Sequence, residues 1–486
     1  MSGVVAWLAP LAVAGGGAGA WWLFRRPQRA LLLLAALVPF NGLLLLVPHP
    51  GVLDGWKEAL VLGALAGALL FGERRVAPRP ALPAWVLPLG ALVALGGATA
   101  VFVGASAIVG LKVAFFYALV PVVLWRCPFT TLDRDRLVGV FMATAVVTSA
   151  VGVAQQMLGA ERLVELGYEY NTTVRFAGDQ LRSFSTFNQP FPFAFYVVAV
   201  SLVAVPVALA DRQRWRNRLF LASTPLLVLG VLSSVVRAAL LAALIGGVWL
   251  LVRRRRALAR LVVPVLALGL LVVGAAGGSF RSADSLLERF DAWRLAVAQV
   301  ADAPFGEGIG ASGAAAEKSG AELTVGSEGS KDPARRDAAI QADNYYVKVL
   351  IELGPIGVWL FAVFLVLTIR EGRAVATARA AIDGAQFDAA LADGITAATV
   401  AAVVAATVSS YWEIFPVDVV FWLLQGVLLS LRLFAPGSSA TPSPCDLAAA
   451  ASTPTSARSC EGFARRRTWI WWPSYSRTPS VPYPPG

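Results

Sequence analysis

The chain has 486 residues, of which 57% are hydrophobic and 15% are charged, with a formal net charge of +11. A soluble protein of this length could not cover its surface with so few charges, so the composition excludes a soluble globular enzyme. Apolar runs of about 18 residues or more recur along the chain, and each is long enough to cross ~30 Å of hydrocarbon as a helix. We therefore expect an all-α, polytopic integral membrane protein.

The apolar runs predict about 12 or 13 transmembrane helices. The third and ninth runs are short, which leaves the count open by one or two. In chain order the candidate spans are 4–24, 30–48, 58–72, 82–103, 106–125, 137–157, 191–210, 218–234, 237–252, 260–278, 346–369, 391–411 and 414–434.

These spans divide the chain into six segments. The helical segments are 1–158, 191–278 and 346–435, and two hydrophilic loops, 159–190 and 279–345, separate them. The second loop contains a predicted amphipathic surface helix around Trp293. Residues 436–486 are rich in Pro, Ser, Thr and Ala, so we expect a disordered cytoplasmic tail.

Arginine clusters orient these spans. They occur at 25–29, 73–79, 126–136, 212–218, 253–260 and 370–379, and alternation of the spans puts all of them on one side. The positive-inside rule makes that side cytoplasmic, so both long loops and the amino terminus are expected outside. Because orientation explains the basic residues, we expect no nucleic-acid partner.

A glycine pattern raises the question of nucleotide binding. The stretch "PFGEGIGASG" contains Gly308-x-Gly310-x-x-Gly313, the spacing that holds a dinucleotide pyrophosphate between a strand and a helix. Here the glycines follow a predicted surface helix instead of a strand, and they lie in an outer loop. We therefore interpret them as a tight turn that requires positive φ angles, and we expect no nucleotide to bind.

The sequence predicts neither a metal centre nor a cofactor. Its three cysteines are widely separated, and His49 is the only histidine. Asp133-x-Asp135 resembles the metal-binding pair of nucleotide-sugar transferases, but it lies in a short loop with arginines and without a surrounding domain. We expect no metal there.

Charged residues at the outer ends of the spans are the candidates for function, because charge is costly near a bilayer. Several converging arginines would suit a phosphate or pyrophosphate, whose oxygens accept forked guanidinium hydrogen bonds. Asp343, just before a span, could take a proton from a sugar hydroxyl. The alternatives are that Arg237 is a solvated turn residue and that Asp343 caps the following helix. The outer-side set is Lys57, Arg175, Arg182, Arg237, Arg289, Arg294, Asp343 and Glu352.

Several segments resemble, in their order, the O-antigen ligase and polymerase superfamily. The resemblance covers roughly residues 30 to 434, and the order of the motifs is more specific than any one of them. The segments are "DGWKEALVL" (54–62), "GLKVAFFYAL" (110–119), "LRSFSTFNQPFPFAFY" (181–196), "SSVVRAALLAAL" (233–244), "RFDAWRLAVAQVADAPFGEGIGASG" (289–313) and "ADNYYVKVLIELGPIGVWLF" (342–361).

The resemblance implies an all-helical membrane fold with a large outer loop. It also implies transfer of glycan from a polyprenyl-pyrophosphate carrier, without a nucleotide sugar or an obligatory metal. Arg182 and Arg289 match arginines that handle the lipid pyrophosphate in the ligases. The ligase pattern H-N-x-Y reads Asp343-Asn344-Tyr345-Tyr346 here, and the aspartate is closer to the polymerases. The implied catalytic residues are Arg182, Arg289 and Asp343, and the substrate-binding candidates are Arg237, Lys57, Asn344 and Tyr345.

The expected function is a metal-independent glycosyltransferase, O-antigen or exopolysaccharide polymerase-like, at the outer face of the bacterial inner membrane. Its expected partners are the lipid-linked glycan, membrane lipids and other polysaccharide assembly proteins. Ligation to the lipopolysaccharide core or to a protein remains an alternative. A transporter of polysaccharide lipids is an alternative of another class, but the internal repeats typical of transporters are not visible.

The topology is testable with reporter fusions. Fusions after Gly178 and Gly320 should report outside the cytoplasm, whereas fusions after Arg218 and Arg256 should report inside, because the arginine clusters fix the orientation. A cytoplasmic signal from both long loops would remove the basis for an outer site.

Overall fold

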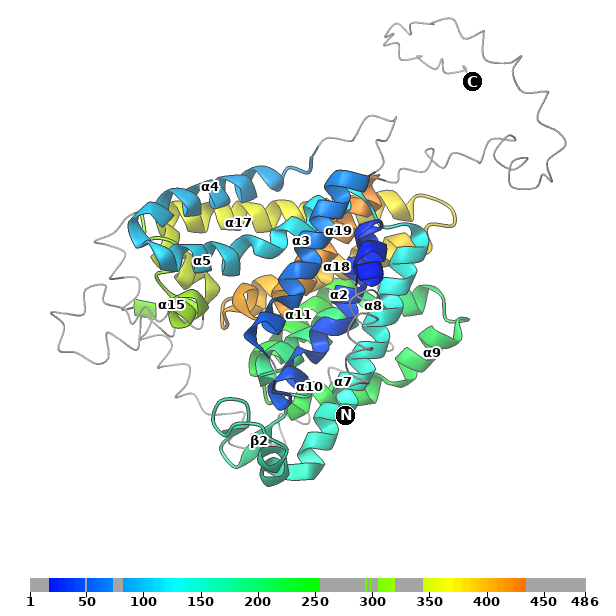
Figure 1. Ribbon diagram of the computed structural model, residues 1–486. Coiled ribbons are helices and arrows are strands. Elements are labelled where there is room, and N and C mark those ends of the chain that lie inside the picture. The colour runs from blue at the N-terminus through cyan, green and yellow to red at the C-terminus, as the bar shows by residue number, and fades with distance from the viewer. Residues whose placement is uncertain are drawn as a thin grey trace, which may run out of the picture. The chain divides into compact units, whose positions relative to one another are not determined.

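The computed structural model describes residues 17–48, 50–72, 82–253, 293–294, 298, 305–319 and 344–433. This part of the chain is a bundle of helices with one two-stranded sheet (Figure 1). The chain is thus an all-α, multi-pass membrane protein, as predicted. Six described segments are long and apolar enough to span a membrane, namely Pro27–Leu46, Ala107–Arg126, Thr131–Glu165, Pro190–Ala210, Tyr345–Ala380 and Gln386–Ala405.

The helices agree with most of the predicted spans. Spans 4–24 and 260–278, the predicted surface helix and the tail lie wholly or mainly outside the described residues. The first elements are α2 (Pro27–Leu37), η1 (Val38–Leu46), η2 (Gly51–Gly55), α3 (Trp56–Phe71), α4 (Val86–Val103), α5 (Ala105–Phe115), η3 (Phe116–Ala118), α6 (Leu119–Arg126) and α7 (Thr131–Glu165). They are followed by β1 (Arg175–Ala177), β2 (Gln180–Arg182), α8 (Pro190–Ala210), α9 (Trp215–Ala222), α10 (Thr224–Ser233), α11 (Arg237–Arg253), α15 (Gly313–Ser319), α17 (Tyr345–Ala380), α18 (Gln386–Ala405), η4 (Tyr411–Glu413) and α19 (Val417–Leu433).

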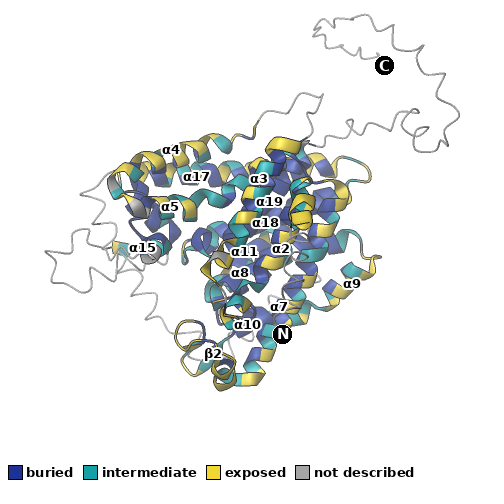
Figure 2. Cartoon of the chain, viewed as in Figure 1, coloured by how far each residue is buried: buried dark blue, intermediate teal, exposed yellow. Residues whose placement is uncertain are grey.

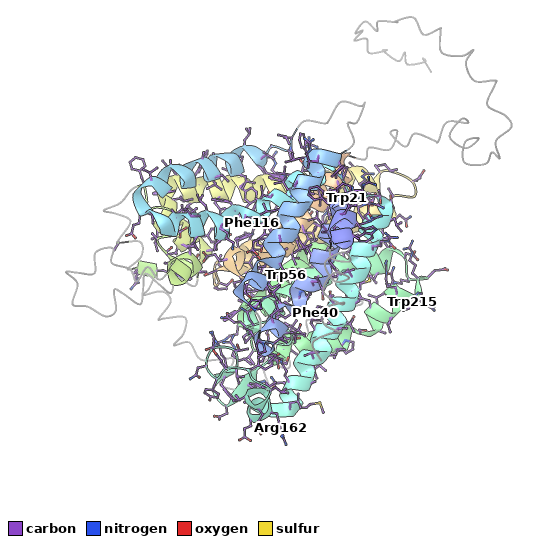
Figure 3. The ribbon with its side chains drawn as sticks, in the orientation of Figure 1. Trp21, Phe40, Trp56, Phe116, Arg162 and Trp215 are labelled. Atoms are coloured by element: carbon purple, nitrogen blue, oxygen red, sulfur yellow. The ribbon has the colours of Figure 1, made fainter. Side chains whose placement is uncertain are left out.

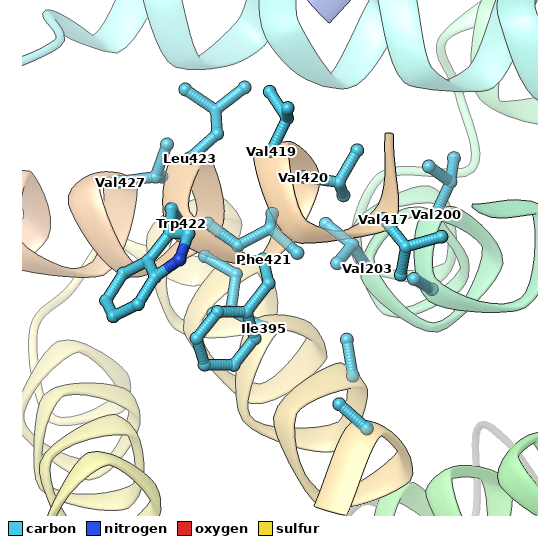
Figure 4. Packing of buried hydrophobic residues seen from close by; sticks show 14 of the residues in the cluster. Val200, Val203, Ile395, Val417, Val419, Val420, Phe421, Trp422, Leu423 and Val427 are labelled. Atoms are coloured by element: carbon cyan, nitrogen blue, oxygen red, sulfur yellow. The ribbon is translucent and has the colours of Figure 1, made fainter. Parts of the chain in front are cut away.

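Helices α8 and α18 lie at the centre of the packing, and both are buried over most of their length (Figure 2). Helix α8 is apolar on all sides, as expected of a helix surrounded by others. Helix α18 is rich in alanine, and such small residues let neighbouring helices approach closely. A Cβ atom on Gly394 of α18 would lie 2.8 Å from the backbone of Val203 in α8. Figure 4 shows side chains of α19 packed beside Val200 of α8 and Ile395 of α18.

Ion pairs join most of the arginine clusters at one end of the bundle. Five of the six clusters contribute an arginine or an aspartate to this set, so the prediction that they share one side is confirmed for them. The sixth, 73–79, lies outside the described residues. The pairs are Arg26–Asp133, Arg134–Asp388, Arg379–Asp388, Arg216–Asp135, Arg253–Asp393 and Arg432–Glu371.

The Asp133-x-Asp135 pair has structural contacts at this end. Asp133 forms a capping box with Thr130 at the start of α7 and accepts a hydrogen bond from Arg26 Nη2 at 3.2 Å. Asp135 Oδ1 accepts from Arg216 Nη2 at 3.0 Å. These contacts give both carboxylates a role in starting α7 and in pairing arginines.

The buried pair between Arg134 and Asp388 gives a stability prediction. Their side chains are 2% and 12% exposed, and Arg134 donates through Nε and Nη2 at 3.1 and 3.0 Å. Replacing Asp388 by alanine leaves a buried guanidinium without its carboxylate, which costs about 3–5 kcal/mol. We expect a large drop in the thermal unfolding midpoint of the purified protein in detergent.

The control is Glu165→Ala, which removes an exposed pair with Arg162 whose side chains are 70% and 61% exposed. Such surface pairs contribute about 0–1 kcal/mol, so the midpoint should barely move. Equal shifts for the two variants would contradict the assignment of Arg134–Asp388 as a structural tie between helices.

Candidate functional site

Two arginines occupy paired positions on the β1–β2 hairpin. The strands pair antiparallel, with Arg175 directly opposite Arg182. Side chains in such a pair lie on one face with Cβ atoms about 4.5–5.5 Å apart, and like charges there repel. Arg175 Nε donates to Thr172 O at 2.9 Å, and an anion bound by the remaining N–H groups of the two guanidinium groups would relieve that repulsion. From the sequence we expected a loop in this region. Each strand is only three residues long, which is too short to show the alternation that identifies a strand.

Two glutamines of α7 hold the segment on both sides of Arg182. Gln156 Nε2 donates to the carbonyls of Leu181 and Ser233, at 2.7 and 3.0 Å. Gln155 Oε1 accepts from the backbone N–H of Ser185 at 2.7 Å. Both glutamines lie near the far end of α7 from the paired arginine clusters, close to the hairpin (Figure 1). The backbone beside Arg182 is therefore fixed by neutral hydrogen bonds.

The hairpin is tied to the turn between α10 and α11. The backbone N–H of Ser183 donates to Ser233 O at 2.9 Å, and Arg182 Nε donates to Ser234 O at 3.4 Å. Val235 follows with a φ of 55°, a sharp turn that lets α11 begin at Arg237. Arg182 and Arg237 are thus placed at one turn, beside the partly positive amino-terminal end of α11. Arg182 also lies over the ring of Phe191, with Cζ 4.8 Å from its centre.

Asn344 caps helix α17. Its Oδ1 accepts from the backbone N–H groups of Tyr346 and Val347 at 2.9 and 3.2 Å. The cap that the sequence analysis offered as an alternative role for Asp343 is therefore supplied by Asn344. The predicted substrate contact of Asn344 stays a prediction, and Asp343 and Arg289 lie outside the described residues.

The other two candidates have different surroundings. Tyr345 is 5% exposed, and its ring lies 5.2 Å from the rings of Phe361 and Trp412, in the aromatic part of the core. Lys57 lies in the first turn of α3, with its Nζ 4.8 Å from the ring centre of Phe415 and 3.9 Å from Glu58 Oε2. These contacts give both residues a part in packing, and their predicted role in substrate binding stays a prediction.

The glycine stretch has the conformation that the sequence predicted. Gly306, Gly308, Gly310 and Gly313 have φ angles of 77°, 101°, 87° and 66°. These angles lie in the left-handed region, which favours glycine. The loop packs onto α17 and α4: Gly308 N–H donates to Glu352 O at 3.0 Å, and Ile309 N–H donates to Thr99 Oγ1 at 3.2 Å.

A buried ionic cluster lies beneath this loop, and sequence reasoning missed most of it. Lys348 Nζ pairs with Glu352 Oε2 and lies 3.2 Å from Glu413 Oε1. The three side chains are at most 3% exposed. A charged pair four residues apart inside the apolar run "YYVKVLIELG" was a signal for the first two residues. Glu413, in a short turn between two spans, carried no comparable signal.

The cluster lies in water-poor surroundings. A small cavity beside Glu352 is lined mainly by aromatic and aliphatic side chains, among them Phe115, Phe361 and Trp412. Burial raises the pKa of the Glu413 carboxyl above its usual range, and the neighbouring Lys348 lowers it in part.

Comparison with known proteins supports the predicted family. The family model of the O-antigen ligases (Wzy_C) matches residues 222–362, whereas no curated protein matches the chain. The matched region contains Arg237, the glycine loop and the start of α17, but not the β1–β2 hairpin or Glu413. The O-antigen ligase family carries out glycosyl transfer. Residues 222–362 therefore match the O-antigen ligase family, and this match supports the superfamily that the motifs resemble.

Proposed function

We propose that this protein transfers or polymerises glycan from a polyprenyl-pyrophosphate carrier onto a sugar hydroxyl. The observation that carries the proposal is the placement of Arg175 opposite Arg182 on a hairpin that is bound to the turn leading into Arg237. The O-antigen ligase match over residues 222–362 supports the class of reaction.

The arginines fit the charge that develops in this reaction. The acceptor oxygen attacks the anomeric carbon of the donor sugar, and the bond from that carbon to the pyrophosphate oxygen breaks. Guanidinium groups of Arg182 and Arg237 would donate forked hydrogen bonds to the departing pyrophosphate, and Arg289 would join them. Asp343 would take the proton of the attacking hydroxyl.

The ion pairs among the arginine clusters indicate which side of the membrane the candidate site faces. Helices α7 and α17 both connect the paired arginine clusters with the candidate site. Helix α7 begins at the arginine end and meets the hairpin near its last turns, whereas α17 begins after its cap Asn344 and ends in the arginine cluster 370–379. The arginine end is cytoplasmic by the positive-inside rule. The candidate site would then open at the outer face of a bacterial inner membrane.

A transporter is the competing class, and one observation bears on it. Helix α17 is broken at Gly354, which has a φ of 66°, and transporters use such breaks to line a substrate path. Here the carbonyls of Ile351 and Glu352 beside the break accept hydrogen bonds from the glycine loop of the same chain. The break is therefore filled by protein, which favours the enzyme. Ligation to another acceptor remains the alternative within the class.

Arg182→Lys tests the pyrophosphate contact. Lysine keeps the charge but loses the forked donation, so we expect transfer to fall on the order of 10²-fold at normal protein levels. The assay is glycan chain length in a deletion strain that expresses each variant, with membrane levels checked by immunoblot. The control is Arg162→Lys, since this exposed arginine near the far end of α7 pairs with Glu165 (Figure 3). Full activity of Arg182→Lys would rule out the forked contact.

Asp343→Asn tests the proposed base. Since Asn344 already caps α17, the variant should fold normally while losing basicity, and transfer should fall on the order of 10²–10⁴-fold. The comparator is Asn344→Ala, which removes the cap and should lower stability by about 1 kcal/mol. A fully active Asp343→Asn protein would place the base elsewhere.

A further inference from the structure

The break in α17 leaves two backbone carbonyls that the glycine loop satisfies. Pro355 has no N–H group, so it cannot donate to Ile351 O, four residues earlier. Instead Glu307 N–H donates to Ile351 O at 2.7 Å, and Gly308 N–H donates to Glu352 O at 3.0 Å. The loop thus replaces hydrogen bonds that the helix lacks, in a region where water is scarce.

The carboxylate of Glu352 makes a second set of contacts with the same loop. Its Oε1 accepts from the N–H groups of Gly310 and Ser312 at 3.1 and 3.3 Å, while its Oε2 pairs with Lys348. Two backbone donors and one ammonium group therefore stabilise a negative charge on Glu352.

Glu413 is in a poorer position to be charged. Its Oε2 accepts from Ala314 N at 3.4 Å, and its Oε1 shares the ammonium of Lys348 at 3.2 Å. Among the described residues, Lys348 is the cation that pairs with these two carboxylates. One lysine cannot neutralise two buried carboxylates, and a buried uncompensated charge is very costly. The proton that balances the cluster therefore belongs on Glu413, which has the weaker donors.

In the sequence, the described segments next to Arg289 and Asp343, two residues proposed for chemistry, are the glycine loop and α17. Residues 305–319 lie between the segment that contains Arg289 and the segment that ends at Asp343, and Asp343 directly precedes the cap Asn344. A carboxylate that binds the loop to α17 therefore joins the two chain segments that lead to these residues. Helix α15, which follows the loop, lies beside α5 (Figure 1), and the loop itself is hydrogen-bonded to α17.

We propose that Glu352 is a positioning residue of the transfer site: its charged carboxylate fixes the loop 305–313 on α17, while Glu413 is neutral and contributes no essential charge. This inference rests on the proposed function, because the position that Glu352 secures matters only if the segments beside it take part in transfer.

Two variants test the proposal as a matched pair. Glu352→Gln and Glu413→Gln each remove one carboxyl group from the same buried cluster, and each leaves one carboxyl group beside Lys348. They differ in whether the loop keeps its charged acceptor. Both are made in the full chain, purified in detergent and compared with the wild type by hydrogen exchange. Transfer is measured with lipid-linked glycan extracted from the organism that carries the gene.

We expect Glu352→Gln to speed exchange of the amides in 306–313 on the order of 10- to 100-fold, because hydrogen bonds to a charged acceptor are lost. The transfer rate at saturating donor should fall at least tenfold, whereas the donor KM should change little, because Arg182 and Arg237 lie on other elements and keep their proposed contacts with the pyrophosphate. Glu413→Gln should resemble the wild type in both measurements.

Three results would overturn the proposal. The first is unchanged hydrogen exchange of the loop amides in Glu352→Gln, and the second is faster exchange in that variant with an unchanged transfer rate. The third is a loss of transfer rate in Glu413→Gln equal to that in Glu352→Gln. If the wild type itself transfers no glycan, the proposed function fails. If the wild type and both variants transfer glycan equally well, the proposed function stands and only the positioning role of Glu352 fails. If Glu352→Gln does not accumulate, Gly308→Ala replaces it. An added Cβ there would overlap Val103 of α4 and displace the loop while Glu352 stays in place. We therefore expect the same fall in transfer rate as in Glu352→Gln.

Discussion

Backbone groups inside a membrane protein must find partners within the chain, and the break in α17 shows how this protein meets that constraint. Gly354 and Pro355 interrupt the helix, and the glycine loop supplies the missing donors to Ile351 and Glu352. A loop can enter so closely only if it presents N–H groups without side chains, which explains its glycines with positive φ. The same need for internal partners explains why Lys348, Glu352 and Glu413 lie together.

The arginines at the two ends of the bundle have different neighbours. At one end arginines meet carboxylates, as in Arg134 with Asp388, and the pairs hold helices together. At the hairpin, by contrast, Arg175 lies opposite Arg182 in the register. Arginines placed opposite each other suit an anionic ligand, and this contrast separates orientation and stability at one end from proposed chemistry at the other.

The sequence predicted the fold class and most helices well, because apolar length and arginine placement are properties of single segments. It also predicted the glycine turn, because the glycines follow a predicted helix and not the strand that a nucleotide site requires. It could not predict the hairpin that pairs Arg175 with Arg182, because strands of three residues have no readable periodicity. Glu413 was missed for another reason: its partner Lys348 lies 65 positions earlier, and only tertiary packing joins them.

Glycan transfer from the polyprenyl-pyrophosphate carrier can be tested directly by reconstitution. The purified protein in liposomes would be supplied with extracted lipid-linked glycan, and free polyprenyl pyrophosphate and lengthened glycan would be measured by mass spectrometry. One polyprenyl pyrophosphate should be released for each glycan transferred. Movement of intact lipid-linked glycan between leaflets, without release of the carrier, would contradict it and identify a transporter instead.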